Sequence, residues 1–320
     1  MHHTSYPAIS PDNAQNSAAR KTVVISGGAG GIGYATAQAF SVAGASTIVI
    51  FTRRQTALDE AKASLDAENS AAGRKTQVWT YQLDIQNAEA TQSAFASIRQ
   101  RLNKGEEGDE KDVDIIVCNA AALAQGSATL DFDMEVYRNA FATNVIGNLN
   151  FVRAFLAPEA SAIPFVAIDG QVKQTTSLTY PSRKKTILDV STVAPLTDFP
   201  GTAPYSASKL AFTSIMRTLY TEASKLKDSP IRIHSFNPGV IKTPGTKDLL
   251  DVDALDLPWV DVSLAAHFAV WLASPAAAFT SGRFMVSNWD VEELLAEEER
   301  FAAEPDLCSL VLNLRSVLVF

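Results

Sequence analysis

Short runs of β-branched and other apolar residues recur along the chain and predict buried strands. Four of the runs are apolar nearly throughout, as expected of strands buried on both faces of a parallel sheet. The predicted strands cover residues 22–26, 47–51, 76–81, 113–117, 185–190, 231–236 and 283–286. Helical patterns lie between them, and the clearest cover residues 34–43, 57–71, 134–156 and 202–227. This alternation predicts an α/β fold in which a single doubly wound parallel sheet carries helices on both faces.

No proline- or glycine-rich linker divides the 320 residues, which predicts one domain with appendages. The polar residues 1–20 are expected to form a disordered N-terminal tail. The domain itself is expected to span residues 21–290. Residues 291–320 form a C-terminal extension whose apolar end should pack on the body or on a partner subunit. The long connection at 164–184 is interpreted as a surface excursion, with a substrate-side flap as the alternative.

Composition argues against nucleic-acid-binding, disulfide-rich, metal-binding and membrane-spanning classes of protein. A net charge of −8 argues against a general nucleic-acid surface. The two cysteines show no disulfide framework, and the four histidines do not form a metal-ligand set. No apolar run reaches about 18 residues, and the N-terminus lacks the apolar segment of a signal peptide. We therefore expect a cytoplasmic protein without a metal or a membrane span, acting on a small-molecule substrate.

A glycine-rich run follows the first predicted strand directly. Its sequence is Ser26-Gly-Gly-Ala-Gly-Gly-Ile-Gly33, and it opens a predicted helix. Glycines allow positive φ angles and let the backbone approach a pyrophosphate at a helix N-terminus. A flexible loop would explain neither the position of the run nor its apolar flanks. The run therefore predicts a dinucleotide-binding turn.

The second predicted strand ends in Thr52-Arg53-Arg54, where dinucleotide folds face the adenosine ribose. A carboxylate at this place would accept hydrogen bonds from a free 2′-hydroxyl and would repel a 2′-phosphate. Threonine and two arginines suit a phosphate instead, although one arginine is expected only to start a solvated helix. The sequence therefore favours NADP(H) over NAD(H).

Tyr205 and Lys209 are the leading candidates for proton transfer. They are four residues apart in a predicted helix, so the phenol and the ammonium can point into one site. A phenol with a pKa near 10 is a poor acid–base catalyst at neutral pH, and a fixed cation nearby lowers that pKa. A tyrosine and a lysine at this spacing ordinarily lie on a solvated helix face. The pair therefore indicates catalysis only together with the other motifs.

Together these motifs resemble the short-chain dehydrogenase/reductase family over roughly residues 21–290, which implies a Rossmann fold of about seven strands. Cys118-Asn119-Ala120-Ala121 takes the place of the family's turn after the fourth strand, with two of four positions changed. A C-terminal stretch around Ser281 and Asn288 is similar to fungal members. The predicted cofactor-binding residues are Ser26, Gly27, Gly31, Ile32, Gly33, Thr52, Arg53, Arg54, Asp84, Ile85, Asn119, Ala120, Tyr205, Lys209, Pro238, Gly239, Val240 and Thr243.

The resemblance also implies roles for single residues. Asp84 would contact the adenine, and the segment from Pro238 to Thr243 would contact the nicotinamide carboxamide. Asn144, in the motif Asn144-Val-x-Gly147, would hold a water on a proton-relay path. Lys209 would hold the nicotinamide ribose as well as assist Tyr205.

The catalytic hydroxyl is less clearly placed. The family has a serine 13 residues before the tyrosine, and this position is Thr192, with Ser191 directly before it. Threonine offers the same donor and acceptor but its methyl group restricts the rotamer. Thr192 is assigned the role, with Ser191 as second choice. The alternative is that both residues only end a strand.

The predicted function is NADP(H)-dependent hydride transfer between the nicotinamide C4 and a carbonyl or secondary alcohol of a small organic molecule, secondary metabolites included. Two alternatives remain: non-redox chemistry such as dehydration or isomerisation, and a non-catalytic cofactor-binding regulator. Substrate specificity is expected to lie in residues 164–184, 195–202 and 244–262. Family members commonly pair through the helices at 134–156 and 202–227, so a homodimer or homotetramer is expected.

Overall fold

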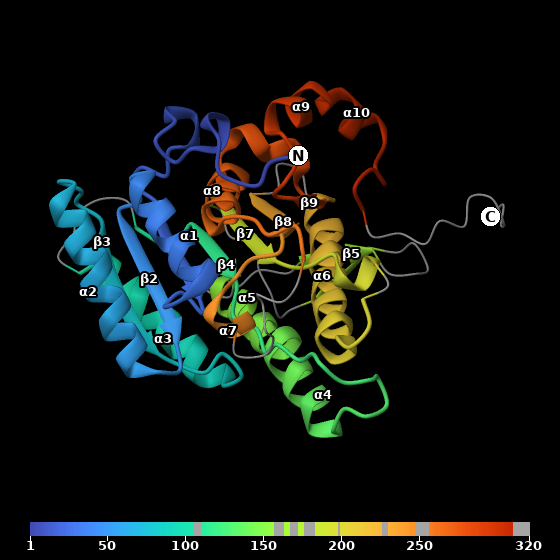
Figure 1. Ribbon diagram of the computed structural model, residues 1–320. Coiled ribbons are helices and arrows are strands. Elements are labelled where there is room, and N and C mark those ends of the chain that lie inside the picture. The colour runs from blue at the N-terminus through green and yellow to red at the C-terminus, as the bar shows by residue number, and fades with distance from the viewer. Residues whose placement is uncertain are drawn as a thin grey trace.

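A seven-stranded parallel sheet forms the centre of the computed structural model (Figure 1). The strand order is β3-β2-β1-β4-β7-β8-β9, and every neighbouring pair is parallel. The chain reverses its direction of winding between β1 and β4, which creates a crevice at the carboxyl ends of these strands. The predicted doubly wound α/β fold is confirmed. The structure describes residues 1–104, 110–156, 163–166, 172–175, 183–197, 199–225, 230–247 and 256–309.

The strands lie where the apolar runs predict them, within two residues at each end. The central strands are buried throughout: all residues of β1, β4 and β7 are inaccessible to solvent or nearly so. Such strands have helices on both faces, which explains why their sequences do not alternate. The bounds are β1 Thr22–Ser26, β2 Thr47–Thr52, β3 Gln77–Gln82, β4 Ile115–Cys118, β7 Lys185–Val190, β8 Ile231–Asn237 and β9 Phe284–Val286.

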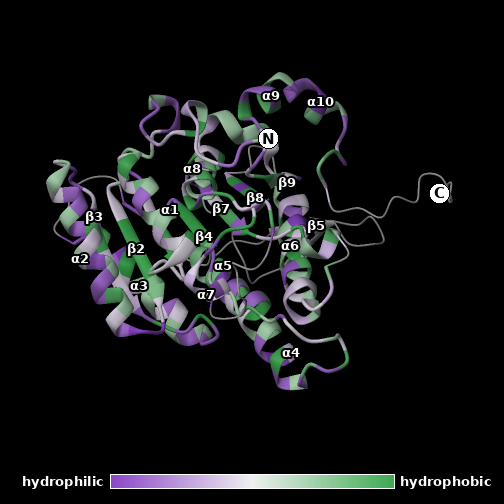
Figure 2. Cartoon of the chain, in the orientation of Figure 1, coloured by the Kyte–Doolittle hydropathy of each residue, from purple (hydrophilic) through white to green (hydrophobic). Residues whose placement is uncertain are grey.

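Two helical layers cover the sheet, and each has its own apolar core. Helices α1 (Gly31–Val42), α2 (Gln55–Ala71) and α8 (Val262–Ala273) pack on one face. Helices α3 (Ala88–Leu102), α5 (Asn148–Leu156) and α6 (Ala203–Ser224) pack on the other. The hydrophobic residues concentrate on the strands and the inward helix faces (Figure 2).

The helix predicted over residues 134–156 is continuous but not uniform. It consists of α4 (Met134–Phe141), a π-helical turn η3 (Ala142–Gly147) and α5. A Cβ at Gly147 would lie 2.9 Å from the Ile85 side chain, so glycine is required for the close packing there. A π-helical turn in a long helix is frequently found at a functional site. This one contains Asn144.

The long connection before β7 contains a short antiparallel hairpin of β5 (Ile163–Val166) and β6 (Val172–Thr175). The rest of residues 164–182 lies outside the described part of the chain, as do residues 226–229 beyond α6. The interpretation of this connection as an excursion or a flap therefore stays a prediction.

The expectation of a disordered N-terminal tail is wrong. Residues 7–9 and 14–16 form 3₁₀ turns, and Ile9 is fully buried in the core on the α8 side of the sheet. The Tyr6 hydroxyl donates to the Trp289 carbonyl at 3.0 Å, and the backbone NH of Asp261 donates to the His3 carbonyl at 2.8 Å. A few apolar side chains dock this otherwise polar segment on the body. Their partners are distant in sequence, so the local pattern of residues 1–20 does not indicate the docking.

The C-terminal extension packs on the body as far as it is described. Helices α9 (Val291–Ala296) and α10 (Glu298–Ala303) bring Phe301 against Phe279, with ring centroids 5.2 Å apart. The backbone NH of Phe284 donates to the Cys308 carbonyl at 2.7 Å, so this segment covers the outer edge of β9. The apolar end at residues 310–320 lies outside the described residues. Within them, no helix combines the length and apolarity needed to cross a bilayer.

The buried position of Ile9 generates a stability prediction. Replacing Ile9 with Ala should leave a cavity and cost about 2–4 kcal/mol of unfolding free energy. The exposed Gln15, changed to Ala, is the control and should cost less than about 0.5 kcal/mol. Chemical denaturation of both variants measures the difference. Equal stability of Ile9→Ala and the unmodified protein would show that the segment does not dock in solution.

Candidate functional site

A cleft of about 1000 Å³ lies at the carboxyl ends of the parallel strands. Its walls come from the turns after β1, β2, β3, β4, β7 and β8, and from the start of α6. Open α/β sheets bind ligands in this crevice, beside the point where the winding reverses. Sixteen of the eighteen predicted cofactor-binding residues line it: Gly27, Gly31, Ile32, Thr52, Arg53, Arg54, Asp84, Ile85, Asn119, Ala120, Tyr205, Lys209, Pro238, Gly239, Val240 and Thr243.

The glycine-rich turn between β1 and α1 has the conformation expected of a phosphate-binding loop. Gly27 and Gly31 have φ angles of +66° and +50°, a region that side chains with a Cβ rarely enter. A Cβ at Gly33 would come within 2.5 Å of the Asn119 amide nitrogen and closer still to the Gly27 carbonyl. The α1 N-terminus can therefore approach the turn closely, and a helix N-terminus placed in this way is suited to bind a phosphate.

Ser26 and Gly33, the two other predicted cofactor-binding residues, support the site from behind the cleft. The Ser26 hydroxyl is fully buried and accepts hydrogen bonds from the backbone NH groups of Asn119 and Ala120, both at 3.0 Å. The Asn119 side chain donates to the carbonyls of Ser26 and Gly27, at 3.0 and 3.2 Å. These bonds join the turns after β1 and β4. The changed residues of the second turn, Cys118 and Ala121, are compatible with this junction.

The far end of the cleft carries the arginines after β2. Thr52, Arg53 and Arg54 all line it, and the Arg53 side chain is 70% exposed. Arg53 lies 3.9 Å from the Asp84 carboxylate, which is itself partly exposed. Because this ion pair is long and exposed, the Arg53 guanidinium remains available to a ligand. Both arginines therefore face the place where the sequence predicts a ribose phosphate.

Tyr205 and Lys209 enter the cleft from the first turns of α6. Pro204 stands in the first turn of the helix, where its missing NH costs nothing. The Lys209 ammonium is 2% exposed and donates to the Val190 carbonyl at 2.7 Å, which fixes α6 to the end of β7. The predicted spacing does bring both side chains into one wall.

The pKa of Tyr205 differs from the sequence-based expectation. Burial of the phenol, and secondarily the negative charge of Asp189, raises the pKa of Tyr205 to about 12. The predicted lowering by Lys209 is therefore not found. Burial likewise lowers the pKa of Lys209, while Asp189 acts in the opposite direction. The phenol is consequently protonated at neutral pH, and its raised pKa makes it a weaker acid than a free tyrosine.

The structure separates the two candidate hydroxyls. Thr192 lines the cleft and is partly exposed, and its Oγ1 accepts from the Ala194 backbone NH at 3.2 Å. The Ser191 residue is 2% exposed, and its hydroxyl lies 2.7 Å from the Thr213 hydroxyl inside the protein. Ser191 also contributes to the cleft wall. The geometry favours Thr192, because its hydroxyl is bound to no other side chain among the residues that the structure describes.

Asn144 is fully buried behind the cleft. Its amide donates to the Ala122 carbonyl at 3.0 Å and to the Ser208 hydroxyl at 2.9 Å, and its oxygen accepts from the Ala122 NH at 2.7 Å. Ser208 in turn donates to the Tyr205 carbonyl at 2.8 Å. Asn144 thus connects the π-helical turn to the end of α6 that carries Tyr205. Its holding of a relay water stays a prediction.

The other end of the cleft combines predicted cofactor-binding residues, parts of the ranges predicted for specificity, and a loop that sequence reasoning did not single out. Gly239 has a φ of +89°, and Val240 pairs with Trp259 in an isolated parallel bridge. Trp259, Leu257 and Phe199 belong to the ranges predicted for substrate specificity. The sequence analysis did not predict the later part of the loop after β4, Leu123 to Gln125, because these residues match no motif. The side chains that line this end are Leu123, Ala124, Gln125, Thr197, Phe199, Pro200, Leu257 and Trp259. Residues 198 and 248–255 of the predicted ranges lie outside the described residues.

Comparison with known proteins agrees with the site. The family model described as short chain dehydrogenase matches residues 21–168 and 173–253. A short chain dehydrogenase/reductase of the fungus Claviceps purpurea is 31% identical over 300 residues, covering 94% of this chain and 88% of that protein. The short chain dehydrogenase/reductase AacuD of Aspergillus aculeatus, also a fungus, is 32% identical over 315 residues, covering 98% and 94%.

A solved structure points the same way. It is described as a short chain dehydrogenase/reductase family protein and aligns with a TM-score of 0.63 at 26% identity, covering 85% of this chain and 98% of its own. Sequence, fold and cleft agree, and the chain belongs to the short-chain dehydrogenase/reductase family.

Proposed function

We propose that the protein is an NADP(H)-dependent oxidoreductase that reduces a carbonyl of a small organic molecule to a secondary alcohol. The observation that carries this proposal is the convergence of Tyr205, Thr192 and Lys209 on one cleft whose opposite end is a glycine turn followed by two arginines. A proton donor, an oxyanion donor and a phosphate-binding turn in one cleft are what carbonyl reduction requires.

The residues present fit a phosphorylated dinucleotide. The positive φ angles at Gly27 and Gly31 bring backbone NH groups to the cleft, and the close approach at Gly33 leaves no room for a Cβ. Arg53 would hold a 2′-phosphate, and Lys209 the ribose at the other end. When bound, the dinucleotide supplies hydride to the carbonyl carbon, or accepts it in the reverse direction.

The side chains of this protein provide the proton and the oxyanion stabilisation. The Thr192 hydroxyl donates a hydrogen bond to the carbonyl oxygen and stabilises the negative charge that develops there. Tyr205 transfers its phenolic proton to the resulting alkoxide, which gives the alcohol and leaves a phenolate. Solvent then returns a proton to this phenolate, and the Lys209 ammonium supplies a positive charge in the same wall of the cleft. Because burial raises the pKa of Tyr205 to about 12, the phenol carries the proton that this step needs at neutral pH.

The position of Arg53 generates a prediction on cofactor choice. Arg53→Asp should weaken NADPH binding roughly tenfold to a hundredfold, because a charge-assisted bond to phosphate is replaced by repulsion. NADH binding should change by less than about twofold, since NADH lacks this phosphate. Lys75→Asp makes the same charge change at an exposed position outside the cleft. Fluorescence titration measures each dissociation constant, and tighter NADH than NADPH binding by the unmodified protein would refute the proposal.

The separation of the two hydroxyls generates a second prediction. Thr192→Val keeps the shape and removes the donor, so kcat should fall about 10²–10³-fold, whereas Thr192→Ser should retain most activity. Ser191→Ala should be mild. Tyr205→Phe should be at least as damaging as Thr192→Val, with cofactor binding retained. Steady-state NADPH oxidation with a carbonyl panel measures all four; loss of turnover in Ser191→Ala but not in Thr192→Val would reverse the assignment.

We also propose a dimer or tetramer formed through the helices on the α6 side of the molecule. Large apolar side chains on α4, η3 and α6 are exposed, with exposed fractions of 60% for Met134, 53% for Ile146 and 37% for Leu210. Isolated exposed apolar residues are ordinary, but several on neighbouring helices mark an interaction surface.

The exposed face generates a prediction on quaternary structure. Ile146→Glu should shift the protein to a smaller species in light scattering at micromolar concentration, because it places a charge in an apolar interface. Leu295→Glu is the matched control, since Leu295 is 37% exposed on α9. A monomer mass for the unmodified protein would contradict the proposed association.

A further inference from the structure

Residues 2–6 form a short strap that joins two segments of the body that are distant from it in sequence. The backbone NH of His2 donates to the Asn288 carbonyl at 2.8 Å, and the Asn288 amide donates to the His2 carbonyl at 2.7 Å. The next residue bonds elsewhere: the His3 carbonyl accepts from the backbone NH of Asp261 at 2.8 Å. The strap therefore connects the segment after β9 with the segment before α8.

Two side chains of the strap attach it to the start of α9. The His2 Nε2 atom lies 2.7 Å from the Asp290 carboxylate, and the His2 ring stacks on the Tyr6 ring with centroids 3.7 Å apart. The Tyr6 hydroxyl donates to the Trp289 carbonyl at 3.0 Å and accepts from the Val291 backbone NH at 2.9 Å. The position of the strap is thus defined by particular side chains as well as by its backbone.

The segment before α8, which the strap bonds through His3, is a wall of the cleft. Trp259 lines the cleft and pairs with Val240 in the isolated parallel bridge, and the Val260 backbone NH donates to the Val240 carbonyl at 2.9 Å. A His3 ring nitrogen lies 3.3 Å from the Trp259 carbonyl, and the bond from Asp261 to His3 follows two residues later. The Trp259 segment is therefore held between the turn at Val240 and the strap.

Both segments that the strap joins also pack on this turn. Gly239 lines the cleft, and a Cβ there would lie 2.6 Å from the Val260 side chain and 3.4 Å from the Asn288 side-chain oxygen. The side chains of Val260 and Asn288 thus converge on one glycine of the cleft wall. Because the strap bonds Asn288 and Asp261, a displacement of the strap would remove the outer support of this wall.

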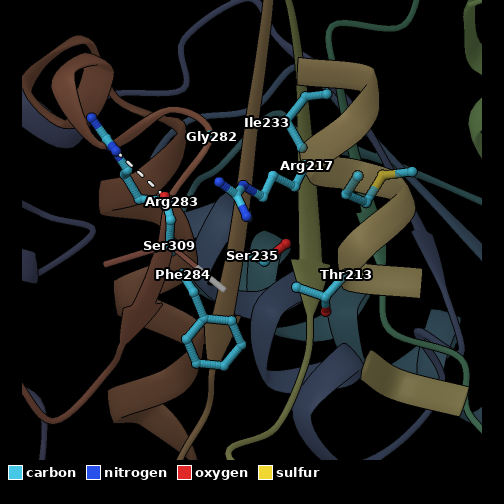
Figure 3. Close-up of a pocket in the computed structure, with 9 residues that line it drawn as sticks. Thr213, Arg217, Ile233, Ser235, Gly282, Arg283, Phe284 and Ser309 are labelled. Carbon is cyan, nitrogen blue, oxygen red and sulfur yellow. Dashed lines mark hydrogen bonds between the residues drawn. The ribbon is translucent and has the colours of Figure 1, made fainter. Parts of the chain in front are cut away.

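The C-terminal segment also packs on the body, but at a different place. It borders a small cavity between α6 and β8, which Arg283 and Ser309 line (Figure 3). Arg283 donates to the Ser309 hydroxyl at 3.4 Å and to the Phe301 carbonyl at 2.9 Å. None of the described residues that line this cavity also lines the cleft. Release of this segment therefore provides a control for release of the strap.

We propose that the strap is a positioning element for the end of the cleft that Trp259 lines, and that it acts by holding Trp259 in the cleft wall. An aromatic side chain held in one place gives a substrate one apolar surface to pack on, and a substrate bound in one orientation reacts faster. No residue of the strap lines the cleft or touches the reacting atoms. The role in catalysis rests on the proposed function, whereas the support of the Trp259 segment does not depend on it.

Hydrogen exchange of backbone NH groups tests this support without turnover. Tyr6→Ala removes two hydrogen bonds and the ring stacked on His2, so the NH groups of Val260 and Asp261 should exchange about fivefold to tenfold faster. Tyr6→Phe keeps the stacked ring, should give a smaller increase, and takes the place of Tyr6→Ala if that variant does not fold. Arg283→Ala releases the C-terminal segment and should leave both NH groups unchanged. Unchanged exchange in the Tyr6 variants, or equal acceleration in Arg283→Ala, would overturn the proposal.

The role in catalysis is tested by a double-mutant cycle of kcat/KM for a carbonyl substrate, with Tyr6→Ala, Trp259→Ala and the double variant. Tyr6→Ala should lower kcat/KM about threefold to tenfold in the unmodified protein and less than about twofold in Trp259→Ala, because the strap acts through Trp259. The NADPH dissociation constant should stay within about twofold. No loss in Tyr6→Ala, additive losses, or an equal loss in Arg283→Ala would overturn this role. If the unmodified protein shows no turnover, the proposed function fails, and hydrogen exchange still decides whether the strap holds the Trp259 segment.

Discussion

The attachment of α6 to the end of β7 is the contact on which the site depends. Lys209 fixes the helix to the Val190 carbonyl, and Thr213 fixes it to the Asp189 carboxylate one turn later. Ser208 connects the same helix to Asn144 on the facing π-helical turn. Buried polar contacts of this kind define one arrangement, since any other packing would leave charged groups without partners. These contacts attach α6 at three points and thereby position Tyr205.

A second set of buried contacts, between the turns after β1 and β4, fixes the end of the cleft that is proposed to bind the cofactor. The Ser26 hydroxyl and the Asn119 amide join the turns after β1 and β4, and Gly33 allows the first helix to approach them closely. This part of the cleft is built from backbone, which explains why its sequence signal is a set of glycines. The arginines after β2 are different: both are exposed, and the contact of Arg53 with Asp84 is loose, so their charge would matter for a ligand and little for folding.

Local patterns predicted the fold, and together with the family resemblance they predicted most of the residues that line the cleft. Apolar runs predicted the strands because a sheet buried on both faces requires them, and spacing alone brought Tyr205 and Lys209 together. Long-range packing was not predictable in this way. The docking of Ile9 depends on the distant α8 side of the core, and the raised pKa of Tyr205 depends on burial and on Asp189, a residue no motif pointed to. The different surroundings of Thr192 and Ser191 also could not be predicted, because they depend on the contact of Ser191 with Thr213 on a distant helix.

Hydride transfer is the central claim, and isotope transfer tests it most directly. The protein is incubated with a panel of carbonyl compounds and NADPH that carries deuterium at the transferable C4 position, and the products are analysed by mass spectrometry and NMR. The account predicts an alcohol with one deuterium on the former carbonyl carbon. It also predicts that the Tyr205→Phe variant forms at most a trace of labelled product. A product formed without deuterium would indicate dehydration or isomerisation, and binding of NADPH without any product across the panel would indicate a non-catalytic protein.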